Sequence, residues 1–121
     1  MVDDMSAKEV REPTFLILAA LARGRMHGYA IIRDAEELSG GRVRLHVGTL
    51  YAALDRLSAD GHVALDGEEV VNGRLRRYYA LTDEGAAALA EVAARMARSA
   101  REAQARLRAQ PRLTPAIGVT P

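Results

Sequence analysis

Apolar positions recur with helical spacing in several stretches of the chain. Residues 15–21 are apolar around the whole helix circumference, which predicts a helix buried on more than one side. Pro13 stands where its first turn would begin, a position that proline favours. A second helix is expected from Tyr29 to about Leu38, because the Ser-Gly-Gly run at 39–41 is a strong stop signal.

A third helix is expected over residues 47–59. Its apolar positions form one stripe at spacings of four and three: Leu50, Leu54 and Leu57. The Asp-Gly pair at 60–61 ends it. Residues 42–45, just before it, alternate basic and apolar side chains, so both a short strand and an extended linker fit this segment.

A β-hairpin is expected next, with one strand beginning at 62–65 and the other over 75–81. Asn72 and Gly73 between them form the strongest short hairpin signal, since both accept a positive φ. Asp-Gly at 66–67 is a competing turn, which leaves the register of the first strand open.

The last predicted element is a long helix over residues 83–109, capped by Thr82. Its apolar stripe has spacings of three or four: Leu89, Val92, Met96, Ala100, Ala103 and Leu107. A helix of about 27 residues spans about 40 Å, more than a domain of this size covers. We therefore expect a second copy of the chain to cover the stripe, with help from Phe15 and Leu16 of the first helix.

Composition limits the other classes of function. The 121 residues fit one domain with a light core, because aromatic residues are 4% of the chain and Trp is absent. The absence of Cys excludes disulfides, zinc-thiolate sites and thiol redox chemistry. No apolar run approaches the roughly 18 residues of a membrane span, and the N-terminus begins with acidic residues. A cytoplasmic protein is expected.

The formal net charge of +1 hides a segregation of charges. Acidic residues lead in residues 1–12, whereas residues 72–79 contain Arg74, Arg76 and Arg77 and no acid. For a polyanionic partner such as DNA the local sign of charge matters more than the sum. The rival interpretation is a solvated hairpin tip, which is the usual role of a run of charges.

The order of elements predicts a mainly α (α+β) fold, a winged helix-turn-helix with a long C-terminal helix. A helix fits the major groove, about 12 Å wide, and a basic hairpin reaches the flanking phosphates. The third helix begins with small or polar residues that allow close approach. The predicted contacts to double-stranded DNA are Arg42, Arg44, His46, Gly48, Thr49, Arg56, Asn72, Arg74, Arg76 and Arg77. The predicted boundaries are a flexible segment at 1–11, the DNA-binding domain at 12–82, the dimerisation helix at 83–109 and a disordered tail at 110–121.

Three runs of residues resemble the PadR family of bacterial transcriptional regulators. They are 27–31 (HGYAI), 48–57 (GTLYAALDRL) and 77–85 (RYYALTDEG). The resemblance implies a homodimeric repressor in which Thr49 and Tyr51 contact the DNA backbone and the wing around Arg74 makes a further contact. Tyr51 is expected to pack its ring beneath the helix and to reach a phosphate with its hydroxyl. At 46–47 this chain has His-Val where the family often has Ser-Pro, which implies a weaker helix cap.

Several other residues have different expected roles. Tyr29 and Tyr79 are expected in the core. Leu89, Val92 and Met96 are candidates for binding a small hydrophobic or aromatic effector, although ordinary packing between paired helices explains them better. The histidines at 27, 46 and 62 are too scattered to predict a metal site, and no catalytic constellation or cofactor motif stands out, so an enzyme is not expected. The alternative function is a winged-helix module that binds an acidic protein partner, and a small-molecule-binding scaffold is a third class.

Overall fold

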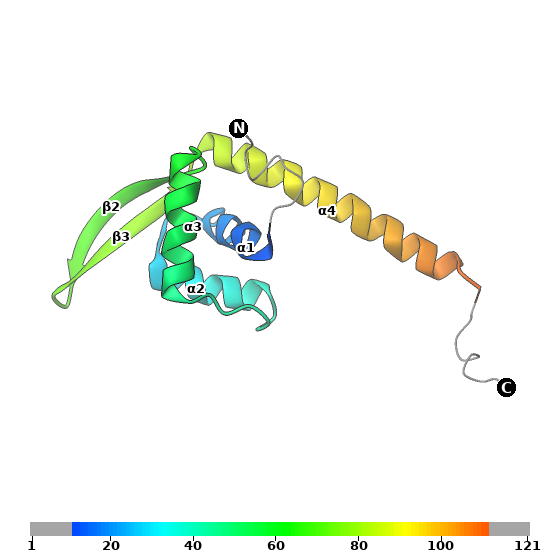
Figure 1. The fold of residues 1–121 in the computed structure, drawn as a ribbon, viewed down its shortest axis with the longest axis horizontal. Helices are drawn as coiled ribbons and strands as arrows, with labels where there is room; N and C mark the ends of the chain where they lie inside the picture. Colours follow the sequence, from blue (N-terminus) through cyan, green and yellow to red (C-terminus); the bar gives the residue numbers. More distant parts are fainter. Residues whose placement is uncertain (1–10, 112–121) are drawn as a thin grey trace.

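A computed structural model describes residues 11–111 (Figure 1). Its elements follow in the order α1 (Glu12–Leu21), β1 (Met26–His27), α2 (Gly28–Leu38), α3 (Val47–Ala59), β2 (Val63–Val71), β3 (Arg74–Leu81) and α4 (Asp83–Ala109). This is the expected α+β fold, with three short helices, a hairpin and one long helix. The predicted flexible N-terminal segment and disordered tail lie almost wholly outside the described residues.

The core is centred on α1, which is buried on several sides as its apolar circumference predicted. Ile17 and Leu18 are fully buried, and α1 contacts α2, α4 and β3. The predicted stripe of α3 is also fully buried and fixes that helix to the domain: Leu50, Leu54 and Leu57. Both bounds of α3 agree with the sequence prediction.

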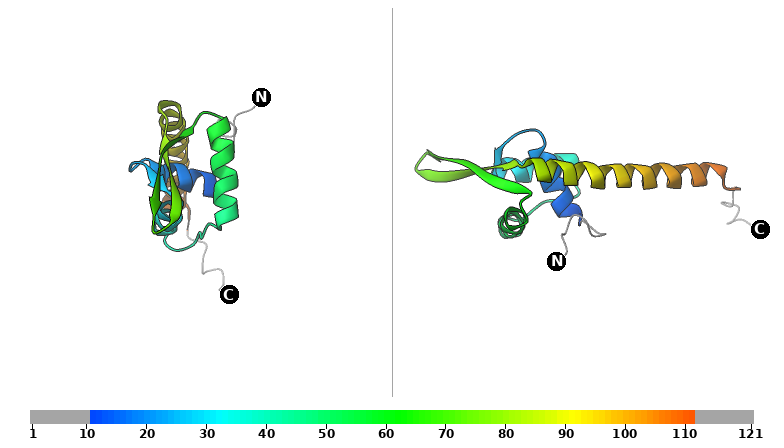
Figure 2. Two further views of the ribbon diagram at one scale, coloured as in Figure 1. Left: turned by 90° about the vertical axis from the view of Figure 1, so that its left-hand side faces the viewer. Right: turned by 90° about the horizontal axis from the view of Figure 1, so that it is seen from above.

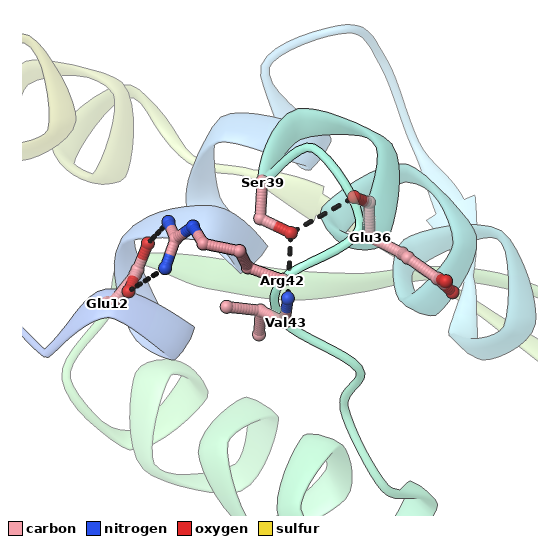
Figure 3. Close-up of polar contacts among 5 residues, drawn as sticks. All are labelled: Glu12, Glu36, Ser39, Arg42 and Val43. Atoms are coloured by element: carbon pink, nitrogen blue, oxygen red, sulfur yellow. Dashed lines mark hydrogen bonds and ion pairs between the residues drawn. The ribbon is translucent and has the colours of Figure 1, made fainter.

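The segment between α2 and α3 is an extended linker and not a strand. Ser39 anchors its beginning, because its Oγ donates to the carbonyl of Glu36 at 3.0 Å and accepts from the backbone N–H of Val43 at 2.9 Å. Arg42 turns toward the start of α1 and pairs with Glu12 (Figure 3). These contacts connect the linker that precedes α3 to both α1 and α2.

The sheet has the order β1-β3-β2 and all its pairs are antiparallel. The two-residue strand β1 was not predicted. Asn72 and Gly73 form the expected turn with φ values of 51° and 78°. The competing pair, Asp66 and Gly67, makes no turn and lies within β2. It lies at an irregularity between Leu65 and Glu68, where the register of β2 against β3 shifts.

The last helix begins at the predicted cap. The Oγ1 of Thr82 accepts from the backbone N–H of Gly85 at 2.9 Å and donates to the carbonyl of Gly61 at 2.6 Å. The first part of α4 packs on the domain and buries Val92. Beyond it the helix projects away, on the side of the molecule opposite to the β2–β3 hairpin (Figures 1 and 2).

One of the two tyrosines predicted to be core residues is not. Tyr79 is buried as expected, but the Tyr29 side chain is 62% exposed. The buried positions of α2 include Gly28, Ile31 and Ala35, so the helix face that meets the core is rotated relative to the predicted one. The prediction for Tyr29 was therefore wrong, because it placed Tyr29 and Ile32 on the inner face of the helix, whereas Gly28 and Ile31 occupy that face.

Candidate nucleic-acid interface

The hairpin, called the wing below (residues 63–81), borders a groove together with His27, the first residues of α2 and Tyr51 of α3. The groove has a volume of about 360 Å³. Its lining combines cationic, aromatic and hydrogen-bonding side chains from all three elements, among them His27, Tyr29, Tyr51, Arg74, Arg76 and Arg77. Such a surface suits a phosphate backbone, since guanidinium groups and hydroxyls supply both charge and donors.

The three wing arginines differ in their partners. Arg77 lies opposite Glu68 across the hairpin, and its Nε is 3.4 Å from the Glu68 carboxylate. Within residues 11–111, Arg74 and Arg76 form no ion pair. The sequence prediction took account of the basic strand alone and did not include Glu68 and Glu69, which lie opposite it. Arg74 and Arg76 are thus the wing cations best placed to meet an anion.

The exposed start of α3 is the second part of the interface. His46 occupies the N-cap position without a side-chain hydrogen bond, as the His-Val departure implied. Gly48 and Thr49 are exposed, and nothing lies within 4 Å of where a side chain on Gly48 would begin. Because the first N–H groups of a helix lack intrahelical partners, this open turn can accept an anion or a base edge.

Tyr51 connects α3 to the wing and to α2. Its ring lies 6.5 Å from the ring of Tyr79, and a Cβ on Gly28 would lie only 2.5 Å from its hydroxyl. Burial raises the pKa of the Tyr51 hydroxyl, and Tyr79 adds to that shift. The half-buried ring beneath the helix agrees with the packing half of the expected mixed role, while contact with a phosphate stays a prediction.

His27 lines the groove, although it was not among the predicted DNA contacts. It belongs to β1 and precedes α2, and its ring meets the Tyr78 ring edge-on at 5.5 Å. Partial burial lowers the pKa of His27, and the charges of Arg76 and Arg33 lower it further. Two signals in the sequence pointed to it: its position directly before a Gly that starts a helix, and its place in the run 27–31 that resembles the PadR family.

The other predicted cations are engaged within the chain. Arg42 pairs with Glu12, as Figure 3 shows, and this hydrogen bond lowers the pKa of Glu12. The Nε of Arg44 lies 3.1 Å from a carboxylate oxygen of Glu36. The remaining one, Arg56, donates to the hydroxyl of Thr14 at 3.4 Å. None of these three lines the groove, so their contact with DNA stays a prediction.

The predicted dimer residues fall into two groups. Leu16 and Val92 are buried within the subunit, and Phe15 and Leu89 are half-buried. Farther along α4, Met96 is 50% and Leu107 is 67% exposed, and Ala100 and Ala103 are exposed as well. Only this second group forms an uncovered stripe on the subunit.

The effector candidates are also divided. A mainly apolar hollow of about 510 Å³ lies between the segment 21–25, the end of β3 and the start of α4. Leu89 lines it, whereas Val92 and Met96 do not. Within the described part of the chain there is no cluster of three or more His, Asp or Glu side chains suited to a metal ion, and no helix is long and apolar enough to cross a bilayer.

Three short helices and a wing, with the first turn of the third helix exposed, define a winged helix-turn-helix protein. Comparison with known proteins gives the family. The model of the transcriptional regulator PadR-like family matches residues 17–91, more than half of the chain. The chain therefore belongs to the PadR-like family. The members of this family are transcriptional regulators and not enzymes. This confirms the prediction that the chain is a regulator and not an enzyme.

Individual relatives agree with the family. Transcriptional regulator Rv3488 of Mycobacterium tuberculosis is 43% identical over 75 residues, which cover 62% of this chain and 66% of that protein. The chain thus spans just under two thirds of this relative's length. A PadR family regulator from Eggerthella lenta is 26% identical with a TM-score of 0.62, covering 79% of this chain and 84% of that one. Bacillus subtilis PadR, solved in complex with operator DNA, has a TM-score of 0.59 at 24% identity over 67% and 47% of the two chains.

Proposed function

We propose that this protein is a transcriptional repressor that binds a pseudo-palindromic DNA operator as a homodimer. The start of α3 enters the major groove, and Arg74 and Arg76 of the wing contact the flanking phosphates. The observation that carries this function is the groove that Tyr51 of α3 lines together with the wing, where two arginines have no ion pair within residues 11–111. The family and the operator complex of Bacillus subtilis PadR support it.

The test is a mobility-shift titration with DNA from upstream of the protein's own gene, at several salt concentrations. The affinity should fall linearly with salt on logarithmic axes, with a slope set by the number of phosphates contacted. The double variant Arg74→Gln/Arg76→Gln should flatten the slope by about two units. Arg108→Gln, at the far end of α4, removes a charge without touching the groove and serves as the control.

A flat salt slope with no preferred fragment would overturn the proposal. Retention of an acidic protein in place of DNA would then support the alternative, an interaction module. Random DNA of the same length distinguishes specific from non-specific binding, because the specific complex should be about a thousandfold or more tighter.

The homodimer is part of the same proposal. The uncovered stripe from Met96 to Leu107 is apolar, and a second copy of the chain would remove it from water. Two subunits would place two copies of α3 about one helical turn of DNA apart, roughly 34 Å. Met96→Glu should shift the protein to monomers in sedimentation experiments. Ala94→Glu adds the same charge on the opposite face of α4 and should leave the dimer intact. Dissociation by both variants, or by neither, would contradict this assignment.

The repressor is further proposed to respond to a small hydrophobic effector that changes the angle between the winged domain and α4. The apolar hollow beside Leu89 lies at that junction and is the best place for such a molecule. Planar aromatic compounds should raise the melting temperature and weaken operator binding. In Ala90→Leu, which fills the hollow, both effects should be lost while operator binding without a compound is kept.

A further inference from the structure

The outer part of the wing is held by few apolar contacts. Residues 64–70 of β2 are all exposed, so burial in the core does not fix the direction in which the hairpin projects. The register shift between Leu65 and Glu68 also interrupts the regular pairing at the point where the hairpin leaves the domain. A bulge of this kind bends and twists a hairpin locally. Some other contact must therefore set the angle of the wing.

Arg25 makes a contact at this bend. It lies in the loop between α1 and β1, and its Nη1 donates to the backbone carbonyl of Asp66 at 2.7 Å, a residue 41 positions away in sequence. The guanidinium carbon also lies 4.5 Å from the centre of the Tyr78 ring. One side chain thus bridges both strands of the hairpin, with a hydrogen bond to β2 and a cation–π contact to β3.

The backbone at the bend is adapted to this side chain. Gly67 has a φ of +112°, and a Cβ there would lie 2.6 Å from Nη1 of Arg25. The backbone conformation therefore favours Gly, and a Cβ would also displace the end of the Arg25 side chain. Asp66 and Gly67 resembled a competing turn in the sequence. In the structure they form the seat of Arg25, the stretch of β2 backbone against which its guanidinium group lies.

The ring under the guanidinium is itself held on two sides. The hydroxyl of Tyr78 donates to Oε1 of Glu69 at 2.7 Å, and His27 of β1 packs edge-on against the ring. Arg25, Tyr78, His27 and Glu69 therefore form a connected layer over all three strands. This layer adjoins the groove, because His27 also lines it.

We propose that Arg25 is a positioning residue for DNA binding: it fixes the angle of the wing, so that Arg74 and Arg76 face the groove that Tyr51 of α3 also lines. This inference rests on the proposed function, because the wing angle matters only if the wing binds DNA. Arg25 acts through the wing and does not itself contact a phosphate. It therefore differs from the wing arginines, whose charge is used directly.

A double-mutant cycle tests this role. In the otherwise unchanged protein, Arg74→Gln should weaken DNA binding roughly tenfold and reduce the salt slope by about one unit. Arg25→Met keeps much of the side-chain length and removes the hydrogen bond and the charge. In the Arg25→Met background the wing no longer faces the groove, so Arg74→Gln should cost less than about twofold. Residues that act as a unit show such non-additive losses.

The opposite result is equally clear. If Arg25 contacted a phosphate directly, or served only as a distant charge, the two losses would add and the proposal would be overturned. Arg108→Met, the same chemical change at the end of α4, is the control and should leave the full effect of Arg74→Gln. Gly67→Ala disturbs the seat and should reproduce the phenotype of Arg25→Met, with little further loss when the two are combined.

Hydrogen exchange of the free protein separates this inference from the proposed function. Arg25→Met should lower the amide protection of residues 68–78 while protection of residues 50–57 in α3 stays unchanged. If the protein bound no DNA but showed this selective loss, the proposed function would fail while the anchoring of the wing by Arg25 would stand. Unchanged protection of the wing would overturn the role of Arg25 whatever the DNA result.

Discussion

The two elements of the proposed DNA interface, α3 and the wing, are held in place by different forces. The helix buries its leucine stripe completely against the core. The outer wing leaves Val70 69% and Leu75 55% exposed and depends on its turn, its cross-strand pairs and Arg25. The position of α3 is therefore inseparable from the stability of the fold, whereas the wing can change its angle while the domain stays folded.

The largest expected effect comes from the same substitution made in both elements. Leu54→Ala should lower the free energy of unfolding by about 2–5 kcal/mol, because it leaves a cavity beneath α3. Leu75→Ala in the wing should cost less than about 1 kcal/mol, since the leucine is half in solvent. Denaturant titration of the free proteins measures both. Similar losses from the two variants would show that the wing belongs to the cooperative core.

A second comparison lies within the wing and concerns charge. Arg74→Gln should weaken binding to every duplex roughly tenfold and lower the salt slope by about one unit. Arg77→Gln should have a smaller effect, because Arg77 is already paired with Glu68. Titrations on operator and random DNA, with melting temperatures measured alongside, provide the test. A larger loss from Arg77→Gln would mean that DNA breaks this ion pair and takes over its arginine.

The helix and the wing should also differ in what they recognise. Thr49→Ala at the start of α3 should weaken operator binding by about fivefold, corresponding to about 1 kcal/mol. The family resemblance gives Thr49 a backbone contact, but in the proposed complex the start of α3 lies in the major groove, where Thr49 can also reach a base edge. Random DNA should then bind nearly as before, because base contacts carry specificity and phosphate contacts do not. The ratio of the two affinities is the quantity to compare with that of Arg74→Gln. An unchanged ratio in Thr49→Ala would place sequence recognition elsewhere on the protein.

The smallest expected effect is a pH dependence from His27, between the two elements. Burial and the charges of Arg76 and Arg33 lower its pKa below the ordinary 6.5, although Glu69 opposes this shift. A depressed pKa in the folded state means that the histidine contributes stability above about pH 6.5 that is lost as the pH falls through the folded value. A DNA phosphate in the groove would raise the same pKa, so DNA binding should take up a proton.

Operator affinity should accordingly increase by roughly twofold to threefold from about pH 8 to about pH 6. His27→Gln should remove this contribution and reduce the loss of stability on acidification. His46→Gln, before α3, is the matched control and should retain both effects. A pH dependence that persists in His27→Gln but disappears in His46→Gln would assign proton uptake to the recognition helix.

Much of the fold was predictable because its causes are local. The spacing of three leucines determined the buried face of α3, and the Asp-Gly pair at 60–61 determined its end. The Asn-Gly pair determined the hairpin turn, and Thr82 determined the start of α4. Helical periodicity, positive-φ turns and side-chain caps all act over a few residues. The same local patterns and the family motifs indicated which surfaces to examine for DNA binding.

Only the tertiary structure decided how distant residues meet. Strand β1 is too short to leave a pattern and exists because it pairs with β3. The exposure of Tyr29 follows from the face that α2 presents to α1. The pairing of Arg42 with Glu12 joins residues 30 positions apart, and that of Arg25 with Asp66 joins residues 41 apart. A cation in the sequence is equally suited to a phosphate, a carboxylate or a backbone carbonyl, and only the packing of the chain determines which of them comes within its reach.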